Sequence, residues 1–300
     1  MKPARDQITA TVIAHSSSSE RVPPLITLQL RYPLIVHNEL MTHRVFSRNT
    51  ASSRAIPVER MIQEVENNPF IPMVWGKNQP GMQAFEELDV VTADRCEQTW
   101  MLACFHALES ARQLHKLGVH KQVANRLLGP FLYTNVVVTA TEWDNWFELR
   151  DHKDAEPHIR LLAQKMRDAI NASVPIIRKS GEWHLPYVNS SDWGVIRQLE
   201  PYGDAYREVT TERQLELARK LSVARCASVS YMTVEGLPMS LDRAEAIYDR
   251  LYTSKPFHAS PFEHQATPDA MYRPGSWKLP GLHGNFKGWI QYRKQMERDR

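Results

Sequence analysis

Cysteine and glycine are scarce in this chain, which has three cysteines and 12 glycines among its 300 residues. Cys96, Cys104 and Cys226 lie far apart and lack the spacing of a metal site. Such a sparse, odd count is typical of a reducing compartment. The chain also has no G-x-G-x-x-G turn, G-x-x-x-x-G-K-[ST] loop, H-E-x-x-H helix, paired C-x-x-C or G-x-S-x-G elbow. These absences exclude the usual dinucleotide turn, phosphate loop, zinc-protease helix and serine-hydrolase elbow.

Long apolar runs and a strong charge of one sign are absent as well. No stretch reaches 18 apolar residues, and the first ten residues lack the apolar run of a signal peptide. We therefore expect a cytoplasmic protein that does not enter a membrane. The net charge is +3, with 37 basic and 34 acidic residues. This balance suits anionic small molecules, and no long basic stripe points to nucleic acid.

The hydrophobic pattern predicts an α/β (α+β) fold with a mixed or antiparallel sheet packed against helices. Strands are expected where Ile, Val, Thr and Leu alternate, and helices where apolar residues recur at helical spacing. A Pro-, Trp-, Gly- and Ser-rich stretch indicates a linker or insertion. We expect one enlarged catalytic domain over residues 1–300, divided into portions 1–175, 176–208 (the linker) and 209–300. The predicted strands are 8–14, 25–31 and 134–141, and the predicted helices are 33–41, 58–65, 92–117, 119–128, 155–171, 210–222, 240–252 and 285–300.

Residues 42–54 gather arginine and small polar side chains into a short segment. Three arginines, one histidine and six small polar residues stand there. Arginine presents a planar fork of donors that suits phosphate and imide oxygens. From composition alone, a solvated turn after a helix is the favoured interpretation, because loops are polar by default.

This segment resembles the signature of the flavin-dependent thymidylate synthases. That signature is Arg-His-Arg, seven residues, Ser, and an Arg two places beyond; here Thr42-His43-Arg44 is followed at the same spacing by Ser52 and Arg54. The signature's first Arg is replaced by Thr42. An Arg-Gln pair that precedes the signature in the family reads Asn38-Glu39 here.

Two further stretches follow the family's pattern in the same order. Arg126, within residues 123–134, matches an Arg that precedes a Leu-Pro step. Arg150, within residues 147–163, matches the Arg of a Leu-Arg motif that contacts the uracil nucleotide in relatives. The family's His and Gln in that stretch are replaced by Asp154 and Glu156. Read without the resemblance, the second stretch is a charged helix N-terminus.

A third block stands in an unexpected place, near the C-terminus. Residues 258–264, HASPFEH, are nearly identical to the family's flavin-binding His-x-Ser-Pro-Phe-Glu-His, which in relatives precedes the signature. Residues 226–231, CASVSY, resemble the segment before that block. The blocks therefore stand in rotated order, and we infer a circularly permuted member, because permutation is tolerated where termini lie close together at the surface. Gln291 and Arg293 are candidates to replace the missing Gln and Arg.

The resemblance implies that the protein methylates dUMP to dTMP with methylenetetrahydrofolate. It implies that reduced FAD delivers the hydride, that NADPH is a further cofactor and that no cysteine nucleophile is needed. It also implies a homotetramer. The catalytic candidates are Arg150, Ser52 and Arg44. The substrate-binding candidates are Ser52, Arg54, Arg126, Arg150, Gln291 and Arg293. The cofactor-binding candidates are His43, Arg44, Val45, Asn49, Ser230, His258, Ser260 and Glu263. No metal site is expected, because His152 and His158 are six residues apart and lack a third ligand.

Two other functions stay open at this point. The replacements at Glu39, Thr42 and Thr50 are compatible with the same chemistry on another pyrimidine nucleotide (UMP or dCMP), or with hydroxymethylation. An acid at Glu39 that faces the ring would accept a hydrogen bond from an amino group, which would favour cytosine. A non-catalytic nucleotide- or nucleic-acid-binding protein is compatible with the basic C-terminal segment and the eight tryptophans.

Overall fold

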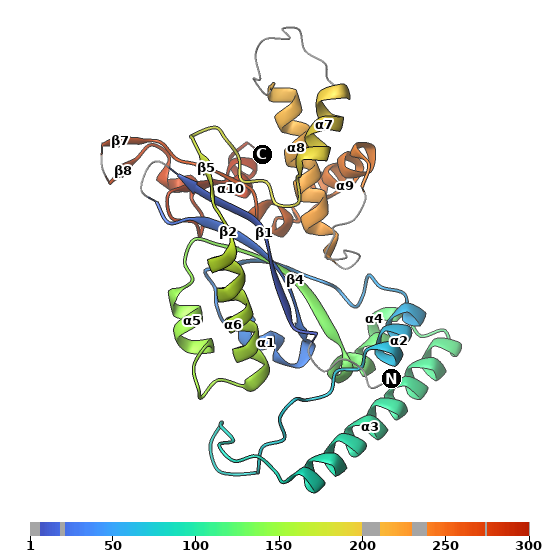
Figure 1. Cartoon of the computed structure of the whole chain (residues 1–300). Coiled ribbons are helices and arrows are strands. Elements are labelled where there is room, and N and C mark those ends of the chain that lie inside the picture. The colour runs from blue at the N-terminus through green and yellow to red at the C-terminus, as the bar shows by residue number, and fades with distance from the viewer. Residues whose placement is uncertain (1–6, 19–21, 200–210, 230–238, 274, 300) are drawn as a thin grey trace.

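A five-stranded sheet forms the centre of the computed structural model, which describes residues 7–18, 22–199, 211–229, 239–273 and 275–299 (Figure 1). The strand order is β3-β4-β2-β1-β5. Neighbouring strands are antiparallel except β5, which is parallel to β1. The predicted mixed sheet is confirmed. Its strands are β1 (Thr9–Ser18), β2 (Leu25–Pro33), β3 (Ser47–Thr50), β4 (Tyr133–Ala140) and β5 (Ile176–Arg178).

One face of the sheet is covered by α6 (Pro157–Ala172) together with α5 (Asp144–Arg150). Alternate residues of β2 and β4, such as Leu28 and Val138, pack against Ile159 and Leu162 of α6 to form the main core. Glu156 caps α6 by accepting from the backbone N–H groups of His158 and Ile159. The chain enters this core from β2 through η1 (Leu34–Val36) and α1 (His37–Met41), as the predicted helix at 33–41 requires.

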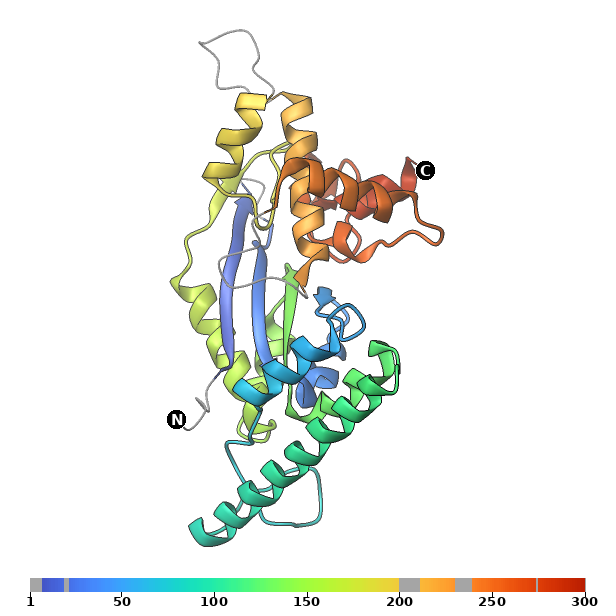
Figure 2. The same cartoon turned by 90° about the vertical axis from the view of Figure 1, so that its right-hand side faces the viewer.

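A second group of helices lies at one end of the sheet. It comprises α2 (Val58–Asn67), α3 (Val90–Lys116), α4 (Lys121–Ala124) and the 3-10 segment η2 (Asn125–Phe131). Their shared core contains Met61 of α2, Leu108 of α3 and Leu128 of η2. The predicted helix at 119–128 is thus a short α-helix followed by a tighter turn, because Pro130 removes a backbone donor. The long helix α3 extends away from the sheet (Figure 2).

The C-terminal part of the chain packs at the other end of the sheet (Figure 1). Trp183, Phe262 and Tyr292 contribute to its core. The expected helix at 285–300 is wrong in its first part, since residues 289–291 form a buried strand that pairs with residues 266–268. The elements are α7 (Ser190–Leu199), α8 (Glu212–Ala227), α9 (Leu241–Thr253), η4 (Ser260–Glu263), β6 (Ala266–Pro268), β7 (Met271–Arg273), β8 (Ser276–Trp277), η5 (Pro280–Leu282), β9 (Trp289–Gln291) and α10 (Tyr292–Arg298).

The expected linker at 176–208 contains ordered structure in its described part. Residues 176–178 extend the central sheet, and Trp183 and His184 are buried. Residues 200–208 lie outside the described residues, as does the candidate Ser230. The division into three portions stays a prediction. Among the helices that the structure describes, none is long and apolar enough to span a lipid bilayer.

Candidate functional site

Arg150 joins the second sequence motif to the first. Its Nε donates to Nε2 of His43 over 3.2 Å, and Nη1 donates to the Glu39 carboxylate over 2.9 Å. Nη2 donates to the Glu39 carbonyl at 3.3 Å and to the Thr42 hydroxyl at 3.2 Å. The last residue of α5 is therefore fixed to the end of α1, and two motifs far apart in the sequence meet in one cluster, which we call the Arg150 cluster (Glu39, Thr42, His43 and Arg150).

The Arg150 cluster keeps its histidine neutral. Burial, reinforced by the nearby charges of Arg150 and Arg48, lowers the pKa of His43 to about 4. Since Nε2 accepts from Arg150, the remaining ring proton is assigned to Nδ1. Burial also raises the pKa of Glu39 above its ordinary value, although Arg150 opposes this effect. The cluster thus combines a fixed cation, a neutral imidazole and a carboxylate that takes up a proton more easily than usual.

Residues 42–54 form a capped turn and a strand. Arg48 donates through Nη1 to the carbonyls of Leu40, Met41 and His43, at 3.4, 2.8 and 3.1 Å. These carbonyls close the C-terminal end of α1, where a guanidinium interacts favourably with the helix dipole. Residues 47–50 then pair with β4 as an edge strand. The interpretation as a solvated turn is therefore wrong for the middle of the segment.

The C-terminal block lies against this segment within the same chain. Gln291, which is 1% exposed, donates through Nε2 to Asn285 Oδ1 at 2.8 Å, to the Glu263 carbonyl at 3.2 Å and to Ser47 Oγ at 3.4 Å. Asn49 donates to the Cys226 carbonyl over 3.0 Å. Gln291 and Asn49 therefore connect the first sequence block to the C-terminal block. Both residues were singled out from the sequence, although as ligand contacts.

A buried chain of hydrogen bonds fixes the same block to the sheet. His264 Nδ1 bonds to Thr139 Oγ1 at 2.8 Å, and Thr139 bonds to Thr27 at 2.7 Å. His184 continues the chain, with 2.8 Å bonds to Thr27 and to Ser16. Burial lowers the pKa of both histidines to about 3, so they are neutral. Sequence analysis missed His184, because a single histidine in an irregular segment gives no signal.

The cofactor that the resemblance implies, FAD, is compatible with the exposed edge of these blocks. The side chains of Arg44, His258 and Ser260 are exposed and form no hydrogen bond or ion pair within the described part of the chain. They therefore offer unused donors to an anionic group, and the exposed Val45 offers apolar surface. Glu263 differs, because its carboxylate is paired with Arg293.

Ser52, Arg54 and Arg126 lie away from the Arg150 cluster. Asn125 is buried and donates to the carbonyls of Ser53 and Ile56, at 2.7 and 3.0 Å. Arg54 follows Ser53 and Arg126 follows Asn125, so the two exposed arginines are each adjacent in sequence to a partner in this hydrogen bond. Arg150 instead has its contacts at residues 39–43, so within the described residues no contact joins the two groups of arginines.

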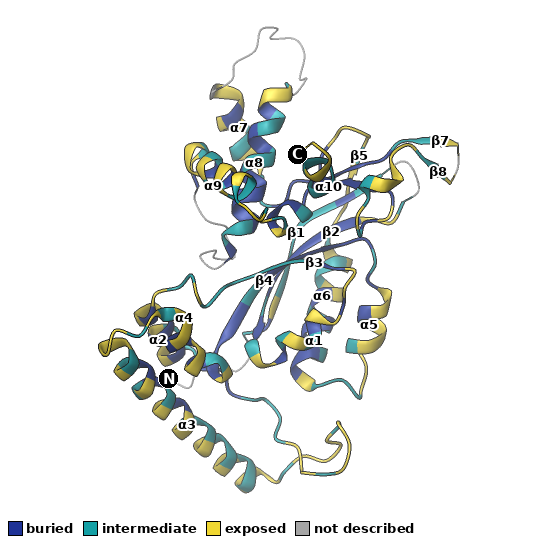
Figure 3. Ribbon diagram, turned by 180° about the vertical axis from the view of Figure 1, so that it is seen from behind, coloured by how far each residue is buried: buried dark blue, intermediate teal, exposed yellow. Residues whose placement is uncertain are grey.

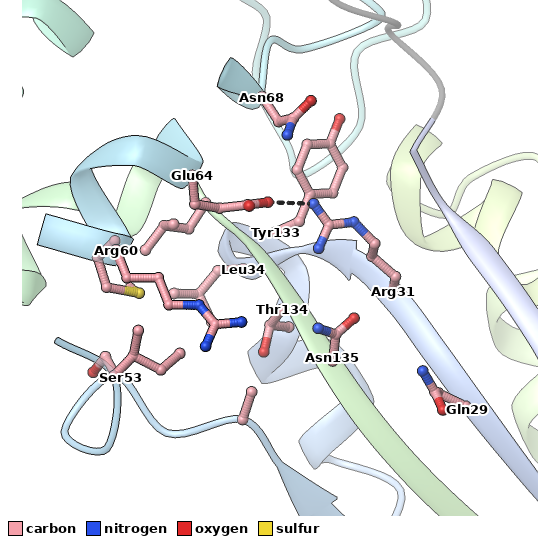
Figure 4. A pocket seen from close by; sticks show the side chains of 14 residues that line it. Gln29, Arg31, Leu34, Ser53, Arg60, Glu64, Asn68, Tyr133, Thr134 and Asn135 are labelled. Atoms are coloured by element: carbon pink, nitrogen blue, oxygen red, sulfur yellow. Dashed lines mark hydrogen bonds and ion pairs between the residues drawn. The ribbon is translucent and has the colours of Figure 1, made fainter. Parts of the chain in front are cut away.

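A pocket of about 460 Å³ opens between α2, the sheet and residues 51–56 (Figure 4). Arg31 stacks 5.0 Å above the Tyr133 ring and pairs with Glu64 at 2.6 Å. Ala51 and Ser53 face this pocket, whereas Ser52 and Arg54 do not line it. Sequence analysis missed the pocket because its residues come from separate elements. The full lining is Gln29, Arg31, Leu34, Ala51, Ser53, Ile56, Arg60, Met61, Glu64, Asn68, Leu132, Tyr133, Thr134 and Asn135.

The cysteines are poor candidates for nucleophiles. Burial raises the pKa of Cys104 to about 11 and raises that of Cys226 further. A thiol must ionise to attack, so these two are inert near neutral pH. Among the described residues, no group of three or more His, Cys, Asp and Glu side chains is arranged to hold a metal ion.

Comparisons with known proteins give one family. Residues 4–176, more than half of the chain, match the family model described as thymidylate synthase complementing protein. Two crystal structures of the UMP/dUMP methylase PolB from Streptomyces cacaoi, bound with 5-Br dUMP and with 5-Br UMP, are similar at 17% and 18% identity. They cover 56% of this chain and 91% and 90% of theirs, with TM-scores of 0.49 and 0.48. No curated protein matches. The chain therefore belongs to the family of thymidylate synthase complementing proteins, the flavin-dependent thymidylate synthases, and is a thymidylate synthase-like enzyme.

Proposed function

We propose that this enzyme methylates the pyrimidine ring of dUMP to give dTMP, with methylenetetrahydrofolate as the one-carbon donor and FAD as the redox cofactor. The observation that carries the proposal is the meeting of three sequence blocks in one chain. Arg150 bonds to His43, and Gln291 bonds to both Ser47 and the Glu263 carbonyl. The third block lies beyond residue 176, outside the family match, so its contacts with the first block support its assignment to the same site.

The residues of the chain bind, orient and polarise. FAD, when bound and reduced by NADPH, supplies the hydride. Arg44, Val45, His258 and Ser260 are proposed to hold it at the exposed edge described above. Arg150 is proposed to stabilise negative charge that develops on a pyrimidine carbonyl, since a preoriented guanidinium costs little reorganisation. In the present arrangement Arg150 contacts Glu39, so the substrate must compete with this carboxylate.

The nucleotide phosphate is proposed to bind at Ser52, Arg54 and Arg126. Arg54 and Arg126 are both exposed and stand next to the hydrogen bond between Asn125 and the Ser53 carbonyl. Their guanidinium groups offer paired N–H donors, which suit a phosphate dianion. Arg150 instead contacts Thr42 and His43, at the start of the segment 42–54 that ends with Ser52 and Arg54. The resemblance implies sites shared between subunits of a homotetramer, and such sharing would bring the two groups of arginines to one nucleotide.

The pocket between α2 and the sheet is the competing location for the nucleotide. Its volume of about 460 Å³ is within the range of small-molecule sites. Arg31 and Arg60 would meet the phosphate, and the amides of Gln29 and Asn135 would meet the ring edge. The Arg54 and Arg60 variants described in the Discussion distinguish the two locations.

The alternative substrate with an amino group needs the Glu39 carboxylate as an acceptor. One oxygen of that carboxylate accepts from Arg150, so this substrate must share Glu39 with the guanidinium. UMP remains the alternative that differs least from dUMP, because the two nucleotides differ only in the ribose 2′-hydroxyl.

The direct test is a conversion assay with the purified protein, FAD, NADPH and methylenetetrahydrofolate. dUMP, UMP and dCMP are supplied separately, and products are identified by mass spectrometry. Formation of dTMP from dUMP supports the proposal. A product from UMP or dCMP alone, or a hydroxymethylated product, would replace it with the corresponding alternative. The Arg150→Ala variant is the negative control and should lose most of the activity.

A further inference from the structure

The pocket between α2 and the sheet contains a buried amide whose nitrogen has no partner. Gln29 of β2 lines this pocket and is only 6% exposed. β2 and β4 are buried for almost their whole length (Figure 3), where a polar side chain ordinarily has its hydrogen bonds satisfied. The Tyr187 hydroxyl donates to Gln29 Oε1 over 3.1 Å, so the free N–H groups are those of Nε2. Among the residues that the structure describes, none accepts from them.

Tyr187 holds the Gln29 amide in this orientation. Its φ of 65° lies in the left-handed region, which residues other than glycine rarely adopt. The segment is fixed to α8, because the Tyr187 carbonyl accepts from Arg225 and the Pro186 carbonyl accepts from the Ser222 hydroxyl over 2.8 Å. Backbone strain of this kind persists where the surroundings enforce it, which is often at a ligand site.

A second amide extends into the same pocket from β4. Asn135 pairs in register with Arg31, and Gln29 is two residues from Arg31, so Gln29 and Asn135 are diagonal neighbours on one face of the sheet (Figure 4). The Asn135 side chain forms no hydrogen bond within the described ranges, and it therefore offers both a donor and an acceptor. A donor on Gln29 beside an acceptor on Asn135 is the complement of a ring amide, which has a carbonyl next to an N–H group.

The charges in the pocket suit an uncharged ligand better than a phosphate. Glu64 lies in the lining and pairs with Arg31 at 2.6 Å. Arg31 also donates to Gln7 Oε1 over 3.1 Å. A phosphate at Arg31 would have to replace the carboxylate and would remain close to it, and two negative charges repel each other strongly where water is partly excluded.

We propose that this pocket is a second ligand site, which binds the ring amide of an uncharged heterocycle, the base of a pyrimidine nucleoside or a pterin. The ring carbonyl accepts from Gln29 Nε2, and the adjacent ring N–H donates to Asn135 Oδ1. The volume of about 460 Å³ accommodates a ligand of this size. Apolar side chains cover the remainder of the ring, namely those of Leu34, Ile56 and Met61.

This site is separate from the one proposed above for the nucleotide phosphate. Ala51 and Ser53 line the pocket, whereas Ser52 and Arg54 do not. A nucleotide held by Ser52 and Arg54 therefore leaves the pocket open, and both ligands can be bound at the same time.

The test is isothermal titration of the full-length protein with thymidine, which has the ring amide but no phosphate. We expect saturable binding with a dissociation constant below about 1 mM. N3-methylthymidine lacks the ring N–H and should bind at least about tenfold more weakly, because Asn135 then loses its donor. Titration with 6-methylpterin distinguishes the two sources of the ring, since the tighter probe identifies the class of ligand. Binding of neither probe would overturn the proposal.

Variants of the two amides locate the bound ring. Gln29→Leu and Asn135→Ala should each raise the dissociation constant of the tighter probe at least about tenfold, and Tyr187→Phe should raise it a few fold by releasing the Gln29 amide. Gln113→Leu, the same substitution at an exposed position of α3, is the matched control and should leave the constant unchanged.

Circular dichroism verifies that each variant is folded, and Asn135→Ala and Tyr187→Phe decide the outcome if Gln29→Leu does not fold. An unchanged dissociation constant in Asn135→Ala would contradict the site. Loss of thymidine binding in Arg54→Ala would also contradict it, because the probe would then occupy the nucleotide site instead.

Discussion

Nε of Arg150 donates to Nε2 of His43 over 3.2 Å, and the Nη1 group of the same guanidinium binds Glu39. One arginine thus fixes both the tautomer of a histidine and the position of a carboxylate. This contact links the first and second motifs of the family within one chain. Together with burial, which is the larger cause, the charge of Arg150 lowers the pKa of His43.

Acid should destabilise the fold through its buried histidines. The folded pKa of His43 is about 4 and lies below the ordinary value of 6.5. Between pH 6.5 and 4 the unfolded chain therefore binds a proton that the folded chain does not, so the free energy of unfolding falls as the pH falls. His184 and His264, with pKa values of about 3, act in the same direction. Urea unfolding at several pH values measures the slope.

Replacement of one histidine isolates its share of that slope. His43→Asn should reduce it by up to about 1.4 kcal/mol per pH unit below pH 6.5. Gln295→Ala, which removes no titrating group, is the control. An unchanged slope in His43→Asn would mean that His43 takes up its proton in the folded state as readily as in the unfolded one.

Glu39→Gln should strengthen nucleotide binding. The carboxylate competes with the substrate for Arg150, and the amide keeps the hydrogen bond without the charge. We expect the dissociation constant for dUMP to fall by a few fold, on the order of 1 kcal/mol. Isothermal titration of the FAD-loaded protein measures it, with Glu39→Asp as the control that keeps the charge. Weaker binding by Glu39→Gln would instead assign Glu39 a direct contact with the ligand.

Gln291→Ala should weaken the packing of the C-terminal block (residues 258–264) against the signature segment (residues 42–54), because Gln291 bonds to both. The substitution leaves the half-buried Asn285 and the buried Ser47 side chains short of a donor, which costs about 1–3 kcal/mol of stability. Flavin affinity should fall as well, because Gln291 also binds the carbonyl of Glu263. The control is Gln295→Ala, one turn along α10, where the cost should stay within about 0.5 kcal/mol. Equal melting temperatures for the two variants would show that the hydrogen bonds of Gln291 do not stabilise the contact between these two segments.

Two arginine variants locate the nucleotide. If the phosphate binds at the outer side of residues 52–54, Arg54→Ala should weaken dUMP binding by about tenfold or more, whereas Arg60→Ala should have little effect. The reverse pattern would place the nucleotide in the pocket that Arg60 lines. Both side chains are exposed, so neither change should alter the fold.

Sequence reasoning found the elements that carry a strong hydrophobic period. β2 and β4 are rich in the β-branched and apolar residues that favour strands, and both are buried along almost their whole length. α3 repeats apolar residues at helical spacing, and Cys104, Leu108 and Ala111 are buried on one side of it. Sequence reasoning missed β3, whose four residues are all polar and whose structure depends on pairing with β4. It also missed β9, since the pairing of Trp289 with Pro268 is a long-range contact.

For the site, the sequence indicated the right segments but not what each side chain contacts. Gln291 and Asn49 were expected to touch ligands, and they join segments of the chain. Arg48, which closes α1 through three carbonyls, gave no signal because a capping arginine has no sequence pattern of its own. The pocket is likewise invisible in the sequence, since strands and α2 contribute its residues separately.

The central claim is that three separated blocks of the sequence build a joint site for flavin and pyrimidine nucleotide. The most direct measurement is the visible absorption spectrum of the purified protein, recorded before and after addition of FAD and then during a dUMP titration. We predict bound flavin whose absorption bands shift saturably with dUMP, and a smaller shift in Arg150→Ala. A protein that binds no flavin even with added FAD, or whose flavin does not respond to any pyrimidine nucleotide, would contradict the account.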